Sequence, residues 1–134
     1  MTDSYPIDFY DYEISIKSAV KNRALAVALD VVRKKYANKQ AMVEKGLLSE
    51  KAGEKMANEQ LVDMAKVYVD HIITGWKGVK YKGKTLAFNK ENAVKFFSDE
   101  DNYLILGEVI AQSTTQANFI KEQEEAESKN SVKS

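Results

Sequence analysis

The sequence predicts a mostly α-helical, compact domain made of two long and two shorter helices, with a short β-hairpin and an N-terminal strand. The chain has a single proline, Pro6, and six glycines, so long stretches contain no residue that breaks a helix. In those stretches apolar residues recur every three or four positions, the spacing of an amphipathic helix. With 134 residues, 44% apolar and 30% charged, the chain has the size and composition of one globular domain.

Residues 1–17 are predicted to form an N-terminal strand or arm. Within them, the segment DFYDYEISIK (8–17) alternates strictly, with Tyr10, Tyr12, Ile14 and Ile16 on one face. Aromatic and β-branched residues at a period of two are typical of a half-buried strand. Because a lone strand is not stable, it must pair either with the hairpin predicted further along the chain or with another subunit.

Residues 18–120 are predicted to form the helical domain. A first long helix runs from Ser18, a plausible N-cap, to about Lys45, and Gly46 suits the left-handed position after its end. Two sets of its apolar residues have helical spacing: Val20, Ala24, Val27 and Val31, and Leu25, Leu29, Val32 and Tyr36. A second long helix has Ser49 as a possible cap and ends near Thr74 and Gly75; its apolar residues include Leu61, Ala65, Tyr68 and Ile72.

The rest of the domain is predicted to contain a hairpin and two shorter helices. The hairpin, residues 76–88, turns at Lys82-Gly83, and Asn89 caps a short helix from Lys90 to Phe97. The last helix starts near Asn102 and is capped by one of three residues: Ser98, Asp99 or Asp101. Residues 121–134 have almost no large apolar side chain and are predicted to form a flexible acidic tail.

The residue types needed for most catalytic or metal sites are missing. There is no cysteine, so a disulfide, a thiolate metal site and a cysteine nucleophile are excluded, which is compatible with a cytoplasmic protein. The single histidine, His71, lies next to Asp70, but neighbours in sequence do not face each other on a helix. No phosphate-binding loop or nucleophile elbow is present. We therefore expect no enzyme, no cofactor and no metal, although chemistry based on Asp70 and His71 is the remaining enzymatic alternative.

The start of the chain and its hydropathy give no sign of export or membrane insertion. The first residues are acidic, where a secretory signal would be basic and then apolar. No apolar run is long enough to span a membrane. The sequence therefore predicts a cytoplasmic protein.

Lysines around the predicted hairpin are the clearest charge asymmetry. Residues 76–95 contain six lysines against the single Glu91: Lys77, Lys80, Lys82, Lys84, Lys90 and Lys95. Interleaved with aromatic residues, they resemble a single-strand nucleic-acid surface. The formal net charge is zero, which favours the alternative that they keep an exposed hairpin soluble and unpaired. A third interpretation is that this basic hairpin attracts the acidic N-terminal arm, within one chain or between copies, so that the protein forms a homo-oligomer.

Several of these residues are candidates for contacts with other proteins. Trp76 either anchors the end of the second long helix to the hairpin or forms an exposed interface residue. The candidate interaction residues are Tyr10, Tyr12, Ile14, Trp76, Lys80, Lys82, Lys84, Phe88 and Phe119.

Residues 60–120 resemble the tail assembly chaperones of long-tailed, siphovirus-type bacteriophages. Three stretches carry the resemblance: HIITGWKGV (71–79), GKTLAFNKENAVKFF (83–97) and YLILGEVIAQSTTQANF (103–119). In that family a helix runs into a W-x-G-V element, followed by a glycine turn, an aromatic residue, a short helix that opens with a polar-x-E-N run, and a last helix ending in phenylalanine. The matching residues here include Trp76, Gly78, Gly83, Phe88 and Phe119.

The resemblance implies a specific function. Such chaperones bind and solubilise the tape measure protein, a long helical rod, help to recruit tail tube subunits around it, and are absent from the mature virion. They act in the cytoplasm of the infected host cell, and many also exist in a longer, frameshifted form. The alternative is a small phage nucleic-acid-binding regulator that uses the Lys-rich hairpin.

Overall fold

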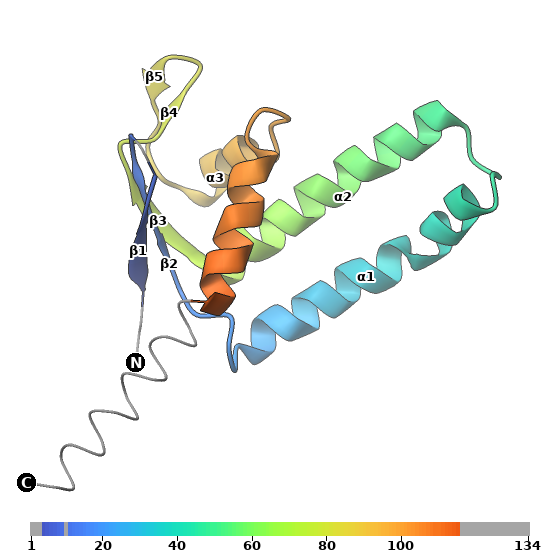
Figure 1. Ribbon diagram of the computed structural model, residues 1–134, viewed down its shortest axis with the longest axis horizontal. Coiled ribbons are helices and arrows are strands. Elements are labelled where there is room, and N and C mark those ends of the chain that lie inside the picture. Colours follow the sequence, from blue (N-terminus) through green and yellow to red (C-terminus); the bar gives the residue numbers. More distant parts are fainter. Residues whose placement is uncertain (1–3, 10, 116–134) are drawn as a thin grey trace, which may run out of the picture.

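The computed structural model describes residues 4–9 and 11–115, and it confirms the prediction of a mostly α fold (Figure 1). Tyr10, Phe119 and the predicted tail, 121–134, lie outside the described residues. The elements, in chain order, are β1 (Tyr5–Asp8), β2 (Glu13–Ile16), α1 (Arg23–Glu44), α2 (Glu50–His71), β3 (Ile73–Lys77), β4 (Lys80–Tyr81), β5 (Lys84–Thr85), α3 (Lys90–Phe97) and a helix at residues 103–115.

The prediction of one continuous strand over residues 8–17 is wrong, because the segment folds back on itself. β1 and β2 are antiparallel, and the backbones of Phe9 and Tyr12 bond to each other across the turn between them. The two rings also stack, with centroids 5.0 Å apart. The expected shared face survives in β2, where Ile14 and Ile16 are both completely buried.

β2 is the central strand of a three-stranded sheet of order β1-β2-β3. Its second partner is β3, and Ile14 lies opposite Trp76. The predicted pairing with hairpin 76–88 therefore holds only for residues 76 and 77, which belong to β3. One face of the sheet carries the buried isoleucines Ile7, Ile14 and Ile16, whereas Pro6 on the other face is exposed. A small sheet therefore shares one core with the helices, which is the usual arrangement for a sheet with a single apolar face.

Two helix boundaries differ from the prediction. Lys21 has φ +60, a left-handed conformation that no helix continues through, so α1 starts after Asn22 rather than at Ser18. The Asn22 side chain accepts a hydrogen bond from the backbone of Leu25, as an N-cap does. At the other boundary α2 ends at His71, because the next residues leave the helix to pair with β2.

Local end signals are confirmed elsewhere. Gly46, which follows the C-cap of α1, has φ +72. Ser49 caps α2 and Asn89 caps α3, and each side chain accepts a hydrogen bond from a backbone N–H group. The turn between β4 and β5 is formed by Lys82 and Gly83, both at positive φ, as a two-residue hairpin requires. The hairpin is shorter than predicted, because residues 76 and 77 belong to β3.

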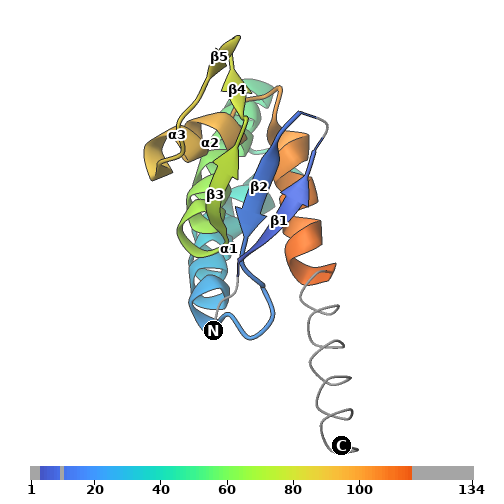
Figure 2. The same cartoon turned by 90° about the vertical axis from the view of Figure 1, so that its left-hand side faces the viewer.

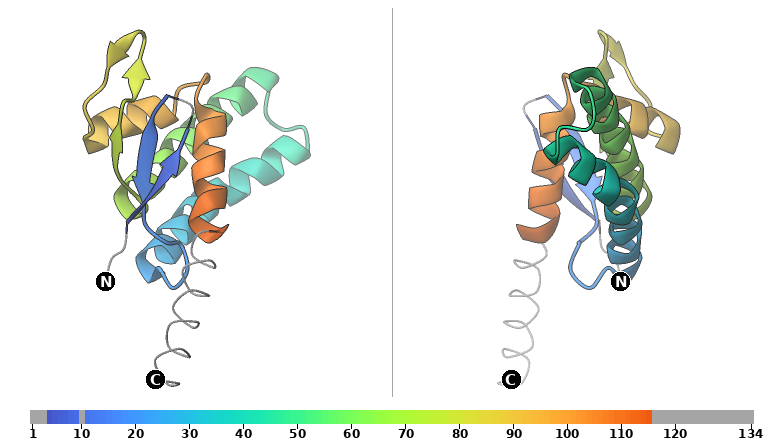
Figure 3. Two further views of the ribbon diagram at one scale, coloured as in Figure 1. Left: turned by 60° about the vertical axis from the view of Figure 1, so that its left-hand side comes forward. Right: turned by 90° about the vertical axis from the view of Figure 1, so that its right-hand side faces the viewer.

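α2 is the central element of the molecule. It packs against α1, α3 and β3. Figure 2 and the left view of Figure 3 show the 103–115 helix, in orange, beside β1, and the backbone carbonyl of Ser113 accepts hydrogen bonds from the Tyr5 hydroxyl and from the Ala19 backbone. Figure 1 shows the far ends of α1 and α2 extending well away from the sheet. We call this pair of helices the α1–α2 arm.

Candidate protein-binding surfaces

Trp76 anchors β3 to the segment that follows the hairpin. Its indole N–H donates a 2.8 Å hydrogen bond to the carbonyl of Leu86, and its ring makes edge contacts with Phe88 and Phe96. This agrees with the first of the two interpretations of Trp76. Phe88 is half-buried in the same aromatic cluster, so both side chains are used mainly within the chain.

Gly78 of the W-K-G-V element has a structural role that the sequence pattern did not reveal. It has φ +76, and a Cβ atom there would lie 3.1 Å from the backbone oxygen of Asp11. The β1–β2 turn therefore lies directly against the base of the Lys-rich hairpin. Tyr12, in that turn, packs its ring edge-on to Phe96.

The lysines of the hairpin are exposed. Within the described part of the chain, Lys80, Lys82 and Lys84 form no ion pair with a carboxylate. Lys82 lies over the ring of Tyr81, 5.4 Å from its centroid. The Tyr81 hydroxyl donates a 2.7 Å hydrogen bond to Asp99, which raises the pKa of Tyr81.

The acidic arm and the basic hairpin are neighbours within one chain. Glu13 of β2 lies opposite Lys77 of β3 in the sheet, and Asp11 is beside Gly78. The acidic and basic segments, which were predicted to attract each other, therefore lie side by side within one molecule. Ile14, the third candidate residue of the arm, is completely buried, so its side chain is used in the core.

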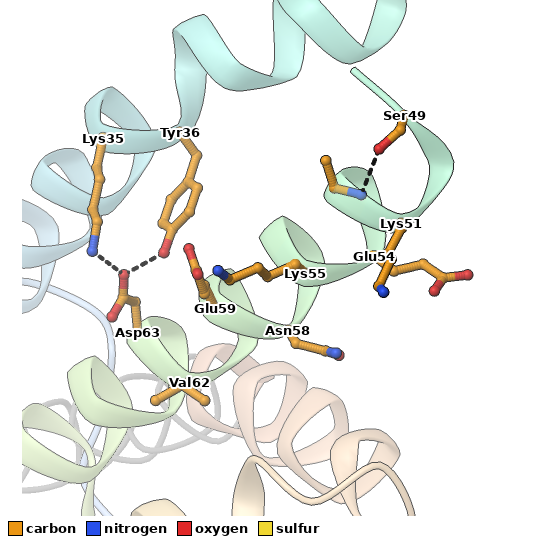
Figure 4. Close-up of a pocket in the computed structure, with 11 residues that line it drawn as sticks. Lys35, Tyr36, Ser49, Lys51, Glu54, Lys55, Asn58, Glu59, Val62 and Asp63 are labelled. Carbon is orange, nitrogen blue, oxygen red and sulfur yellow. Dashed lines mark hydrogen bonds and ion pairs between the residues drawn. The ribbon is translucent and has the colours of Figure 1, made fainter.

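The α1–α2 arm contains a groove of about 840 Å³ between its two helices (Figure 4). Near one end, Asp63 of α2 accepts hydrogen bonds from the Tyr36 hydroxyl, at 2.6 Å, and from Lys35, at 2.7 Å. The hydrogen bonds from Lys35 and Tyr36 hold the pKa of Asp63 below its usual value, whereas burial and the neighbouring carboxylate raise the pKa of Tyr36. Further along, the lining is mixed in charge, with Lys51, Lys55, Glu54 and Glu59.

α1 is apolar on two opposite sides, as its two sets of spaced residues suggested. Leu25, Val32 and Tyr36 are buried against the rest of the molecule. Val27 and Val31 point the other way and are 60% and 62% exposed. Nothing in the described part of the chain covers them.

A second exposed apolar region lies between α2 and the 103–115 helix, and the sequence analysis did not predict it. Tyr103 and Leu104 are 52% and 71% exposed, and a groove of about 340 Å³ runs beside Tyr103. The signal that could have revealed it is the stretch Tyr103-Leu104-Ile105-Leu106, whose four consecutive large apolar residues cannot all face one core from a helix.

Side chains that could bind a metal ion are scattered in the described residues. No three carboxylate or histidine side chains there are grouped in a way that could hold a metal ion. His71 ends α2, where its backbone carbonyl accepts a hydrogen bond from the Asn22 side chain. None of the described helices is both long and apolar enough to cross a membrane.

Comparison with known proteins places the chain among phage proteins. A family model described as YdaY prophage protein matches residues 20–130. The match covers most of the chain, which therefore belongs to this prophage protein family. No curated protein and no solved structure matches the chain.

Proposed function

We propose that this protein is a tail assembly chaperone of a long-tailed phage, which binds and solubilises the tape measure protein and helps to recruit tail tube subunits. In this proposal it acts in the host cytoplasm as a homo-oligomer, without catalysis, and is absent from the mature virion. Membership of a prophage family supports a phage role, and the resemblance over residues 60–120 supports the specific one.

The structural observation that carries the proposal is the uncovered apolar surface on the helices. Val27, Val31, Tyr103 and Leu104 are all more than half exposed. A rod-shaped helical protein exposes apolar stripes before it is assembled, and a chaperone has to cover them reversibly. Apolar faces and grooves on helices are a common means of binding such stripes.

The resemblance also gains support from the positions of its motif residues. Trp76, Gly78 and Phe88 form the junction between β3, the hairpin and α3. Gly83 forms the hairpin turn at φ +80 and Asn89 caps α3. These five motif residues therefore have structural reasons for their identity, as a pattern that specifies a fold would require.

The alternative, a nucleic-acid-binding regulator, has less support. The observation in favour of this alternative is the exposed hairpin, in which Lys80, Lys82 and Lys84 form no ion pair with a carboxylate of the described residues. A single-strand binding surface also needs aromatic faces free to stack on bases. Trp76 and Phe88 pack against each other, and Tyr81 is engaged with Asp99, so the aromatic residues of this region are already in use.

The test is co-expression with the tape measure protein of the same prophage. We expect the tape measure protein to be insoluble alone, and soluble and co-purified when this protein is present. A Val27→Gln, Tyr103→Ser double variant, which removes exposed apolar side chains without touching the core, should lower the recovered complex. An equally insoluble tape measure protein in both cases would contradict the chaperone function.

The nucleic-acid alternative is tested separately. Binding of single-stranded and duplex DNA and RNA is measured at low salt, where contacts between lysines and phosphates are strongest. A regulator should bind, and should lose affinity when Lys80, Lys82 and Lys84 are replaced by Gln. The chaperone proposal predicts no measurable binding under these conditions.

Self-association is measured on the intact chain by light scattering over a range of concentrations. Removing the N-terminal arm would not be informative, because Ile14 and Ile16 belong to the core. A monomeric mass at every concentration would contradict the homo-oligomer part of the proposal.

A further inference from the structure

The groove between α2 and the 103–115 helix is lined mainly by apolar residues. Its floor includes Leu106, which is 2% exposed, with Leu61, Met64 and Ile110 half-buried around it. Tyr103 stands at its edge and Ala57, Gln60 and Gly107 complete it. Its volume, about 340 Å³, is at the lower end of the range that binding sites usually have, roughly 300–1,000 Å³.

The shape of the groove suits a helix. Its walls are two helices, and the lining residues on each span about two turns, from Ala57 to Met64 and from Tyr103 to Ile110. Gly107 is exposed in its wall, and a Cβ atom there would meet nothing within 4 Å. Small residues such as Ala57 and Gly107 allow the backbone of a bound segment to approach closely.

The residues that line the groove carry no charge, but the segment that leads into the 103–115 helix is acidic. Glu108, further along the helix, lines a different hollow. Residues 98–115 contain no lysine or arginine, and their four carboxylates are Asp99, Glu100, Asp101 and Glu108. Three of them come just before Tyr103. Asp99 is engaged with Tyr81, whereas Glu100 and Asp101 are exposed to solvent.

The α2 side continues this acidic character. Glu50 and Glu54 precede Ala57 by seven and three residues, a spacing that places them on the same side of the helix. Glu54 also borders the groove of the α1–α2 arm. Lys51 and Lys55 line that other groove together with Glu54, so of these two carboxylates Glu50 is the one that lies outside it.

From this combination we propose that the groove binds an amphipathic helix whose apolar stripe is flanked by lysines or arginines. Apolar side chains at a spacing of three and four residues fill the floor, and the basic flanks face Glu100, Asp101 and Glu50. The inference rests on the proposed function for the identity of the natural partner, a segment of the tape measure protein. The groove itself selects only an apolar stripe with basic flanks.

The test uses the full chain and two synthetic peptides of about five turns that share one leucine stripe. One peptide has lysines beside the stripe and the other has glutamates. We expect calorimetry to detect binding of the lysine peptide only, with an affinity that falls as salt is added. Equal binding of both peptides, or binding of neither, would overturn the proposal.

Variants locate the site. Gly107→Gln places a side chain in the groove, starting from a Cβ position with nothing within 4 Å, and Tyr103→Ser removes the exposed edge of the groove. We expect each to weaken the lysine peptide about tenfold or more, as the loss of a central contact does. Leu47→Gln, which removes an exposed apolar side chain from the connection between α1 and α2, is the matched control and should leave the affinity unchanged. An affinity lost in the Leu47 variant and kept in the other two would overturn the assignment of the site.

The two proposals fail in different ways. If wild-type protein binds the lysine peptide but never solubilises the tape measure protein, the groove is correct and its natural partner is another basic helix. If Gly107→Gln solubilises the tape measure protein as well as wild type does, the chaperone function holds and this groove is not its binding site.

Discussion

Gly78 offers the sharpest test of how the structure is held together. It lies where the base of the Lys-rich hairpin meets the β1–β2 turn, at φ +76. An alanine there would meet two penalties. Its side chain disfavours the left-handed conformation, and its Cβ atom would stand 3.1 Å from the carbonyl oxygen of Asp11, a backbone atom that cannot move alone.

The magnitude follows from comparison with two other glycines. Gly83 has almost the same φ, +80, but a Cβ atom there has open space, so Gly83→Ala carries the conformational penalty alone, about 1 kcal/mol. Gly78→Ala adds the contact with Asp11 and should cost about 2–3 kcal/mol in total. Gly53, inside α2 and also with open space, should gain up to about 1 kcal/mol on substitution by alanine.

The assay is urea unfolding of the three variants followed by circular dichroism, with the slope of the transition compared to wild type. The loss of conformational freedom in the unfolded chain is similar for each Gly→Ala change, so differences among the variants report on the folded state. Equal stabilities of the Gly78 and Gly83 variants would refute the steric argument. A Gly78 variant as stable as wild type would also refute the argument that the positive φ of Gly78 disfavours alanine.

Three further substitutions test other contacts, each by urea unfolding. Trp76→Phe removes the hydrogen bond to the Leu86 carbonyl and part of the aromatic cluster, and should cost about 1–3 kcal/mol. Asn22→Ala removes both the cap of α1 and the bond to the His71 carbonyl, and should cost about 1–2 kcal/mol, whereas Asn22→Ser should recover much of the cap. Asp63→Asn should cost about 1 kcal/mol at neutral pH. Because the folded pKa of Asp63 is below its ordinary 3.8, this carboxylate stabilises the fold above that pH. Its contribution is lost as the pH falls through the folded value, so the Asn variant and wild type should converge in acid; a pH-independent difference would contradict this reasoning.

The sequence predicted those features of the fold that depend on neighbouring residues. Ser49, Asn89 and Gly46 were correct as helix ends, because a cap forms from one side chain and the nearest backbone groups. The Lys82-Gly83 turn was correct for the same reason. Lys21 could not be predicted, because a lysine has no intrinsic preference for the positive φ that it adopts before α1.

Features that depend on distant pairing were missed. Asp11 is a turn-favouring residue in the turn between β1 and β2, but it also fits the polar face of the alternation in residues 8–17, so it did not mark the turn. The end of α2 is set by pairing of Ile73 with Ile16, which is 57 positions earlier in the chain. A helical pattern in the sequence continues through such a segment because only the sheet decides its conformation.

The candidate binding surfaces show the same limit, and they matter for the proposed function. Periodicity identified both apolar sets on α1, but it could not tell that Leu25 and Tyr36 would be buried and Val27 and Val31 exposed. Which of the two sets is buried depends on where α2 lies. Once that is fixed, the exposed stripe of α1 and the groove beside Tyr103 lie on different helices and have different surroundings, since only the groove has a one-sided acidic border. Repeated binding along a rod favours self-association, because several linked contacts add avidity. In the proposed function the acidic groove takes the basic helix. That leaves the valine stripe of α1, beside which Asp30 pairs with Arg33 and Lys34, as the surface for a second copy of the chain.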